Sequence, residues 1–165
     1  MAYRALGMKA DGQVRLLSRN GKDFTARFAS IARALKALPN DTVIDGEIVA
    51  YDTDGHLSFN VLQNHRGVGT ELQLYAFDLM TLRGRDLTRE PLEKRREILR
   101  ARVMPRLSDS IRYSETMEAS PAELIEAVRE QGFEGIVAKR RDSVYKPGQR
   151  SAMCRKCACY SGAIS

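Results

Sequence analysis

The sequence lacks any run of about 18 consecutive apolar residues, which is the length that a membrane-spanning helix needs. Its N-terminus also lacks the charged segment followed by an apolar segment that is typical of a secretory signal. Internal repeats, linkers and low-complexity segments are absent too. These absences predict a soluble, cytoplasmic protein with no membrane partner, in which the 165 residues form one domain around a hydrophobic core.

Cysteine and histidine are scarce, and their positions argue against a metal site built from them. The three cysteines, Cys154, Cys157 and Cys159, lie close together near the C-terminus, whereas His56 and His65 are far away in the sequence. A structural metal site usually takes four ligands in two separated pairs. We therefore expect free thiols in this segment.

Positive charge is concentrated in one segment. The formal net charge is +6, and residues 139–156 hold seven basic residues and one acidic residue, so the rest of the chain is balanced. Such a segment suits the phosphates of a nucleotide or of nucleic acid. A solvated basic tail is the alternative, and charge alone does not decide between the two.

The first forty residues predict a hairpin and a helix. Residues 3–8 and 13–18 flank Asp11 and Gly12, a dipeptide that is favoured in two-residue hairpin turns because its backbone tolerates positive φ. Between positions 28 and 38, apolar residues recur at helical spacing. This spacing predicts an amphipathic helix of about four turns, which a Pro-Asn pair ends.

Strands and further helices follow. In a strand over residues 42–51, the carboxylates of Asp45 and Glu47 share one face. Residues 72–79 are nearly all apolar, as in a strand that is covered on both sides. The remaining elements are a helix from Pro91 to about Val103, a capping box at 120–123 that opens a helix ending near Gly132, a strand over 134–140 and a turn at 146–148. Together these elements indicate one α+β domain.

Six short motifs occur along the chain in a fixed order. They are Ser-Arg-Asn-Gly at 18–21, Asp-Gly-Glu-Ile-Val at 45–49, Ser-Phe-Asn-Val-Leu-Gln at 58–63, Tyr-Ala-Phe-Asp at 75–78, Glu-Gly-Ile-Val-Ala-Lys at 134–139 and Ser-Val-Tyr-Lys-Pro-Gly-Gln-Arg-Ser at 143–151. Any one is a weak signal, but six with fitting spacing are specific. From about Tyr3 to Lys156, the chain resembles the adenylation domain of ATP-dependent DNA ligases, especially the ligase module of bacterial non-homologous end-joining enzymes.

The resemblance implies a nucleotidyltransferase with antiparallel sheets flanked by helices, which uses ATP and Mg²⁺ and acts on nicked or broken double-stranded DNA. In the family, a lysine attacks the α-phosphate of ATP and carries AMP, which passes to a DNA 5′-phosphate and is displaced by a 3′-hydroxyl. The implied roles are adenine stacking for Phe77, ribose contact or Mg²⁺ binding for Glu47 and Glu134, catalytic neutralisation of the α-phosphate for Lys139 and Lys156, and phosphate contact for Arg4 and Arg19.

Each of these residues also has a plainer interpretation. Phe77 in an apolar strand is, taken alone, more often a core residue than a base platform. Glu47 could belong to the solvated face of an edge strand. Glu134 and Lys139 are five residues apart, so a regular strand would point them to opposite faces unless a bulge or strand end intervenes.

The first motif of the family, Lys-x-Asp-Gly-x-Arg, departs most from the sequence. Aligning its arginine on Arg4 places the nucleophilic lysine two residues before Met1. Lys9 also precedes an Asp-Gly pair, but Arg15 comes one position too late, and Lys9 lies at about half the usual separation from Ser18. We expect a hairpin turn there rather than the nucleophile.

The C-terminal end departs as well. The family has tryptophan at the position of Cys154 and a second base at Ala158, so only Lys156 remains of the closing basic pair. The OB-fold domain that ligases use to clamp DNA is not in the sequence. We therefore expect a partial adenylation domain over residues 1–165, truncated at both ends, with a divergent tail over 153–165.

Two functions remain open from the sequence. One is an ATP-dependent DNA ligase fragment whose self-adenylation is impaired, and the other is a non-catalytic module that binds ATP or DNA. An RNA-ligase or capping-type relative shares the skeleton, but residues 58–63 and 143–151 favour a DNA ligase. Because the strand at 3–8 would lack upstream neighbours, we also expect an exposed N-terminal edge that promotes self-association.

Overall fold

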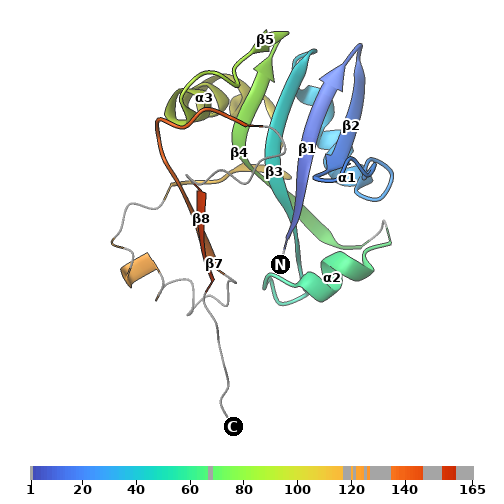
Figure 1. Ribbon diagram of the computed structural model, residues 1–165. Helices are drawn as coiled ribbons and strands as arrows, with labels where there is room; N and C mark the ends of the chain where they lie inside the picture. Colours follow the sequence, from blue (N-terminus) through green and yellow to red (C-terminus); the bar gives the residue numbers. More distant parts are fainter. Residues whose placement is uncertain are drawn as a thin grey trace.

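A twisted six-stranded sheet forms the centre of the computed structural model, which describes residues 2–66, 69–116, 120, 122–124, 126, 135–146 and 154–158 (Figure 1). Its strand order is β2-β1-β3-β4-β5, and β6 pairs with β4 in parallel. The strands are β1 (Tyr3–Ala10), β2 (Gln13–Ser18), β3 (Thr42–Tyr51), β4 (Glu71–Leu82), β5 (Arg85–Asp86) and β6 (Ile111–Tyr113). The other pairs in this sheet are antiparallel, so the α+β expectation is confirmed.

The predicted N-terminal hairpin is present. Ala10 pairs with Gln13, and the two residues between them, Asp11 and Gly12, have φ of +48° and +74°. Positive φ at both central positions is what a type I′ turn requires, and its twist matches that of the flanking strands. The expected exposed N-terminal edge, however, was wrong: β1 is hydrogen-bonded to β2 on one side and to β3 on the other.

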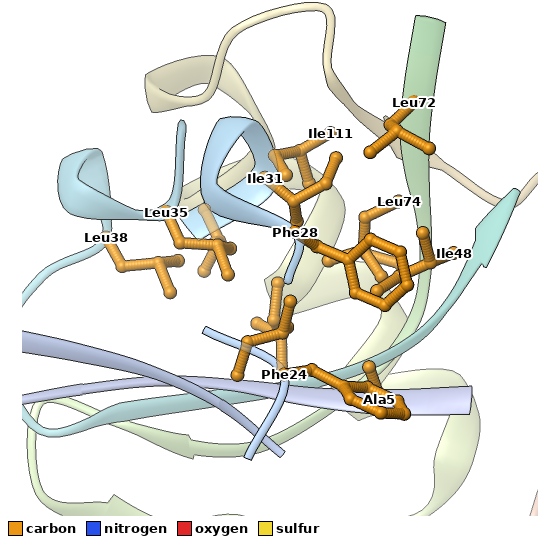
Figure 2. Packing of buried hydrophobic residues seen from close by; sticks show 14 of the residues in the cluster. Ala5, Phe24, Phe28, Ile31, Leu35, Leu38, Ile48, Leu72, Leu74 and Ile111 are labelled. Atoms are coloured by element: carbon orange, nitrogen blue, oxygen red, sulfur yellow. The ribbon is translucent and has the colours of Figure 1, made fainter. Parts of the chain in front are cut away.

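One face of the sheet is covered by a short helical segment, α1 (Ala29–Ala34) followed by η1 (Leu35–Ala37). Figure 2 shows Phe28, Ile31 and Leu35 packed toward Ile48 and Leu74 of the sheet. The prediction of about four helical turns was too long. The residues before Ala29 form a turn that is tied to β2: the backbone N–H of Phe24 donates to the Leu16 carbonyl at 2.7 Å, and that of Phe28 donates to the Phe24 carbonyl at 2.9 Å.

Strand β3 has the alternation that the sequence predicts. Ile44, Gly46, Ile48 and Ala50 are buried on the helix-covered face. Gly46 is required there, because a Cβ atom would lie 2.7 Å from the carbonyl oxygen of Tyr75 on β4. Strands β3 and β4 therefore approach each other closely at the point where the opposite face carries Asp45.

Helical segments flank both ends of the sheet. Between β3 and β4 lies α2 (Phe59–Asn64), whose N-cap Ser58 accepts the backbone N–H of Val61 at 3.3 Å. After β5 comes α3 (Leu92–Ile98), which continues through η2 (Leu99–Val103) into η3 (Met104–Arg106), so the predicted helix from Pro91 to Val103 is confirmed. The capping box at 120–123 forms, since the backbone N–H of Ser120 donates to Glu123 Oε2 at 2.9 Å and that of Glu123 donates to Ser120 Oγ at 3.4 Å. The expected helix end at Gly132 lies outside the described residues.

A separate two-stranded antiparallel ribbon consists of β7 (Gly135–Lys139) and β8 (Cys154–Ala158) (Figure 1). The sequence predicted β7 but not β8, which carries Cys154 and Cys157. The expected turn at 146–148 lies largely outside the described residues. None of the helices in the described part of the chain combines the length and the apolar character that crossing a membrane requires.

Candidate nucleotide-binding site

Phe77 lies at a β-bulge, on the face of the sheet that points away from the helix-covered core. Asp45 of β3 pairs with Asp78 of β4, whereas the next residue, Gly46, pairs with Ala76, so Phe77 has no partner on β3. Leu72, Leu74 and Ala76 are core residues, so strand alternation alone puts Phe77 on the other face, and the bulge adds Asp78 to that same face. Phe77 is half-buried and is not a member of the core cluster among the described residues. This placement favours a platform for a base over a core side chain.

Two cations converge on the Phe77 ring. The Nζ atom of Lys139, from the end of β7, lies 4.0 Å from the ring centroid, and the guanidinium carbon of Arg4, from β1, lies 5.7 Å from it. Cations over an aromatic ring gain about 0.5–1 kcal/mol each at exposed sites. The fold thus brings together three of the predicted site residues from strands that are far apart in the sequence.

The guanidinium of Arg4 is held by a buried carboxylate. Its Nε and Nη2 atoms donate to the two oxygens of Asp45 at 3.1 and 2.5 Å, and the Asp45 side chain is fully buried while Arg4 is 38% exposed. This fork raises the pKa of Arg4, so the guanidinium stays charged. Burial raises the pKa of Asp45, and Arg4 and Lys139 oppose that rise. Asp45 takes two of the five donors of Arg4, and the partly exposed guanidinium faces the Phe77 ring.

The carboxylate of Asp78 is bound by a second arginine in the same two-bond manner. Nε and Nη2 of Arg95, from α3, donate to its two carboxylate oxygens at 2.8 and 2.9 Å, and both side chains are almost fully buried. Asp45 and Asp78 are direct cross-strand partners, an arrangement that is unfavourable unless each charge is neutralised. The sequence analysis missed Asp78 and Arg95. An aspartate inside the apolar run 72–79 was the available signal.

Tyr145 lies near both carboxylates, Asp45 and Asp78. It is half-buried, and burial together with the neighbouring Asp45 carboxylate raises the pKa of its hydroxyl, which is therefore protonated at neutral pH. Its ring lies 6.0 Å from the guanidinium carbon of Arg95. Lys139 and the segment after it thereby contribute a cation and a neutral hydrogen-bonding group, Tyr145, to the region around Asp45.

For the remaining predicted site residues, the described part of the chain gives no contact with the Phe77 ring. Glu47 is exposed on the same face of β3 as Asp45 and stands opposite Arg4 on β1 and Tyr75 on β4. Arg19 is exposed in the turn after β2, and within the described part of the chain it makes no hydrogen bond or ion pair to the residues above. Lys156 stands opposite Val137 on the β7–β8 ribbon, and Glu134 lies outside the described residues.

Lys9 does not belong to this site. It lies five residues further along β1 than Arg4, about 16 Å in an extended strand, and an odd offset places the two residues on opposite faces. Its Nζ donates to the carbonyl oxygen of Lys36 in η1 at 2.7 Å, on the helix-covered face. The expectation that Lys9 belongs to a hairpin and not to a nucleophile motif is supported by this geometry.

A group of side chains that could bind a metal ion, two aspartates and a histidine, lies in the turn after β3. One ligand atom each from Asp52, Asp54 and His56 falls within 4.8 Å of the others. The turn itself explains this grouping, because Asp52 Oδ1 accepts the backbone N–H groups of Asp54 and His56 at 3.0 and 2.9 Å.

Comparison with known proteins agrees with this architecture. Residues 3–157 match the family of ATP dependent DNA ligase domains. The fold and the family match thus define the catalytic domain of a nucleotidyltransferase, and the chain belongs to the ATP-dependent DNA ligase family.

Its relatives place it more narrowly, with the LigD type. The multifunctional non-homologous end joining DNA repair protein LigD of Mycobacterium tuberculosis is 38% identical over 151 residues, which cover 91% of this chain and 19% of that protein. The LigD protein of Pseudomonas aeruginosa is 37% identical over 147 residues, with coverages of 87% and 18%.

Solved structures show the same likeness. The ligase domain of M. tuberculosis LigD superposes with a TM-score of 0.82 at 36% identity, and the match covers 96% of this chain and 51% of that one. A mycobacterial DNA ligase D complexed with ATP and MES gives a TM-score of 0.77 at 36% identity, with coverages of 93% and 50%. The chain therefore spans about half of these solved ligase domains and about a fifth of the LigD proteins.

Proposed function

We propose that this chain binds ATP, with adenine stacked on Phe77 and the phosphates directed toward Lys139 and Arg4. The observation that carries the proposal is the placement of Lys139 Nζ 4.0 Å from the Phe77 ring centroid, with Arg4 on the same ring. A π platform between two cations suits a ligand that has an aromatic base at one end and a polyanion at the other. The flexible stem of Lys139 allows its ammonium to move from the ring to the phosphates as the base stacks.

Magnesium binding is the second part of this proposal. Mg²⁺ prefers oxygen ligands in octahedral geometry and usually keeps several waters, so one exposed carboxylate beside a triphosphate is sufficient. Glu47 fits this role because it is exposed on the site face of β3. Asp45 does not fit, because both of its oxygens accept hydrogen bonds from Arg4. When bound, the ion would neutralise phosphate charge next to the two cations.

The reaction to which this site contributes is that of the family: transfer of AMP from ATP through a lysine to a 5′-phosphate of nicked or broken double-stranded DNA, followed by sealing. Lys139, and Lys156 from β8, would stabilise the charge that develops on the α-phosphate as pyrophosphate leaves. Arg19 would contact DNA or nucleotide phosphates from the turn after β2.

A non-catalytic ATP- or DNA-binding module is the second candidate, and the position of Lys9 favours it for residues 1–165. Lys9 is bonded to Lys36 on the opposite face from Arg4, so it cannot act on an α-phosphate bound at Phe77. We expect this polypeptide to bind ATP without forming a covalent adduct at Lys9.

Intact-protein mass spectrometry after incubation with ATP and Mg²⁺, with peptide mapping, separates the two candidates. Calorimetric titration with ATP on the same sample measures binding. Binding without an adduct supports the non-covalent module, whereas an AMP adduct supports the full first step of the family reaction. No ATP binding in calorimetry would reject the ligase reaction and the ATP-binding module, and would leave only a module that binds DNA.

A further inference from the structure

Arg95 joins three segments of the chain through one guanidinium. Nε and Nη2 bond to Asp78 on β4, while Nη1 donates to the carbonyl oxygen of Glu90 at 2.6 Å and to that of Ser143 at 3.1 Å. Its side chain is 2% exposed, so none of these bonds competes freely with water. Charge-assisted, buried hydrogen bonds of this kind are among the strong ones.

The next residue on α3, Arg96, holds the same bulge from the backbone side. Its Nη1 donates to the carbonyl oxygen of Phe77 at 2.8 Å, and its Nη2 donates to the carbonyl oxygen of Ser114 at 2.5 Å. Two consecutive arginines therefore bond to the bulge. Arg96 bonds to the main chain of Phe77, and Arg95 bonds to the side chain of Asp78. Both arginines thus hold β4 at the bulge, where Phe77 and Asp78 lie on the same face of the sheet.

The segment after Lys139 is anchored to the start of the same helix. The backbone N–H of Leu92 donates to the Ser143 carbonyl at 2.9 Å, and that of Glu93 donates to the Arg141 carbonyl at 2.9 Å. Ser143 thus shares its carbonyl oxygen between the main chain of α3 and the guanidinium of Arg95. Lys139 leads directly into this docked segment.

We propose that Arg95 is a positioning residue for nucleotide binding, which fixes the Phe77 platform and the Lys139 ammonium relative to each other. The inference rests on the proposed function, namely that ATP binds at Phe77. Arg95 itself is buried and touches neither nucleotide nor phosphate in this role. It acts by tying the bulge on β4, through Asp78, to the segment that follows β7, through Ser143.

The test is a double-mutant cycle in which ATP affinity is measured by calorimetry. Arg95→Met combined with Asp78→Asn removes the guanidinium without leaving a buried, unpaired carboxylate, and the Asn side chain can still accept the backbone N–H of Leu79, which bonds to Asp78 Oδ1 at 2.8 Å. We expect this pair of substitutions to weaken ATP binding about tenfold with Lys139 present and only about threefold in the Lys139→Ala background. Equal losses in both backgrounds, or no loss, would overturn the inference.

Two controls keep a positioning role distinct from a general loss of stability. Leu99→Ala removes a buried side chain from the continuation of the same helix without touching the bulge, so it should lower the unfolding midpoint yet leave ATP affinity within about twofold. If Leu99→Ala weakens ATP binding as much as the Arg95 variant, positioning by Arg95 is rejected. Arg95→Lys, which keeps the charge but loses the fork, serves if the double variant does not fold, and about a threefold loss that shrinks without Lys139 is expected.

The outcome for the unaltered chain separates this inference from the proposed function. If the unaltered chain does not bind ATP, the proposed function fails and the inference falls with it. If the unaltered chain binds ATP, the proposed function survives, and only the coupling between Arg95 and Lys139 decides the role of Arg95.

Discussion

Asp45 and Asp78 stand directly opposite each other on β3 and β4. The carboxylate of Asp45 accepts two hydrogen bonds from Arg4, and that of Asp78 accepts two from Arg95. Two buried like charges in cross-strand positions would oppose pairing of the strands. Arg4 from β1 and Arg95 from α3 neutralise them, and Phe77, which the bulge leaves without a partner on β3, lies next to Asp78 on the same face. The site is therefore held by a charge network that is also part of the sheet.

Removing Arg4 should destabilise the fold in a pH-dependent way. In Arg4→Ala, Asp45 remains buried without its partner, and we expect a loss of about 3 kcal/mol at neutral pH, the low end for broken buried pairs because Arg4 is partly exposed. Burial already raises the pKa of Asp45, and Arg4 opposes that rise, so the variant raises the pKa further.

The sign of the pH effect follows from that direction. An acid whose pKa is higher in the folded state binds its proton more tightly there, so stability falls as the pH rises from the unfolded-state pKa to the folded-state pKa. Denaturant unfolding at pH 4.5 and pH 7 should show a smaller loss for Arg4→Ala at the lower pH. Asp45→Asn added to Arg4→Ala should restore stability at neutral pH, and an equal loss at both pH values would contradict the assignment.

Phe77 offers the most direct test of the base platform. Phe77→Leu keeps an apolar side chain but removes the ring, and we expect ATP affinity to fall by about 1–3 kcal/mol, the usual contribution of one base stacked on an aromatic side chain. Calorimetry measures the affinity and thermal unfolding measures the fold. Because Phe77 lies outside the core cluster of the described residues, the melting temperature should change little. A collapse of stability with unchanged ATP affinity would favour a core role.

Much of this framework could be predicted because it is local. The Asp11-Gly12 turn carries its own backbone signal, and period-two alternation placed Asp45 and Glu47 on one face of β3. The start of α1 could not be predicted, because the residues before it are tied to β2 by bonds such as that from the Phe24 backbone N–H to the Leu16 carbonyl. Local periodicity describes each element well but says nothing of such long-range bonds.

The geometry around Phe77 shows the same limit. Its bulge has no signature in the apolar run 72–79, since it arises from register between β3 and β4. Arg95 could not be paired with Asp78 from spacing, because the two residues lie on different elements 17 positions apart. The order of motifs predicted Phe77 and Lys139 as site residues, whereas only the fold shows that Lys139 lies over the Phe77 ring.

Lys9 should be dispensable for nucleotide chemistry. Its Nζ is engaged with Lys36 on the helix-covered face, away from Arg4 and Phe77. Lys9→Ala should leave ATP affinity unchanged within about twofold and should cost about 1 kcal/mol or less of stability, as for one exposed hydrogen bond. Intact-mass analysis with ATP and Mg²⁺ should give no adduct on Lys9 in the parent chain. A mapped AMP on Lys9 would overturn this assignment.

The basic segment after β7 makes the last prediction, which concerns DNA. Arg141 and Lys146 are exposed there, close in sequence to Lys139, and reversing both to glutamate replaces two positive charges by two negative charges in the segment that follows the site. If duplex phosphates contact this segment, affinity for nicked DNA should fall, and the slope of log affinity against log salt should become shallower by about 2. Fluorescence anisotropy at several salt concentrations measures both quantities.

Arg33→Glu with Lys36→Glu is the matched control, because both residues are exposed and belong to the segment α1–η1 on the other face of the sheet. Net charge changes equally in the two variants, so general attraction between a basic protein and DNA would weaken both to the same extent. A selective effect of the Arg141 and Lys146 reversal assigns DNA binding to the face that carries Phe77. Equal effects would mean that the basic segment is a solvated surface, and the DNA contact would then have to be sought elsewhere on the sheet.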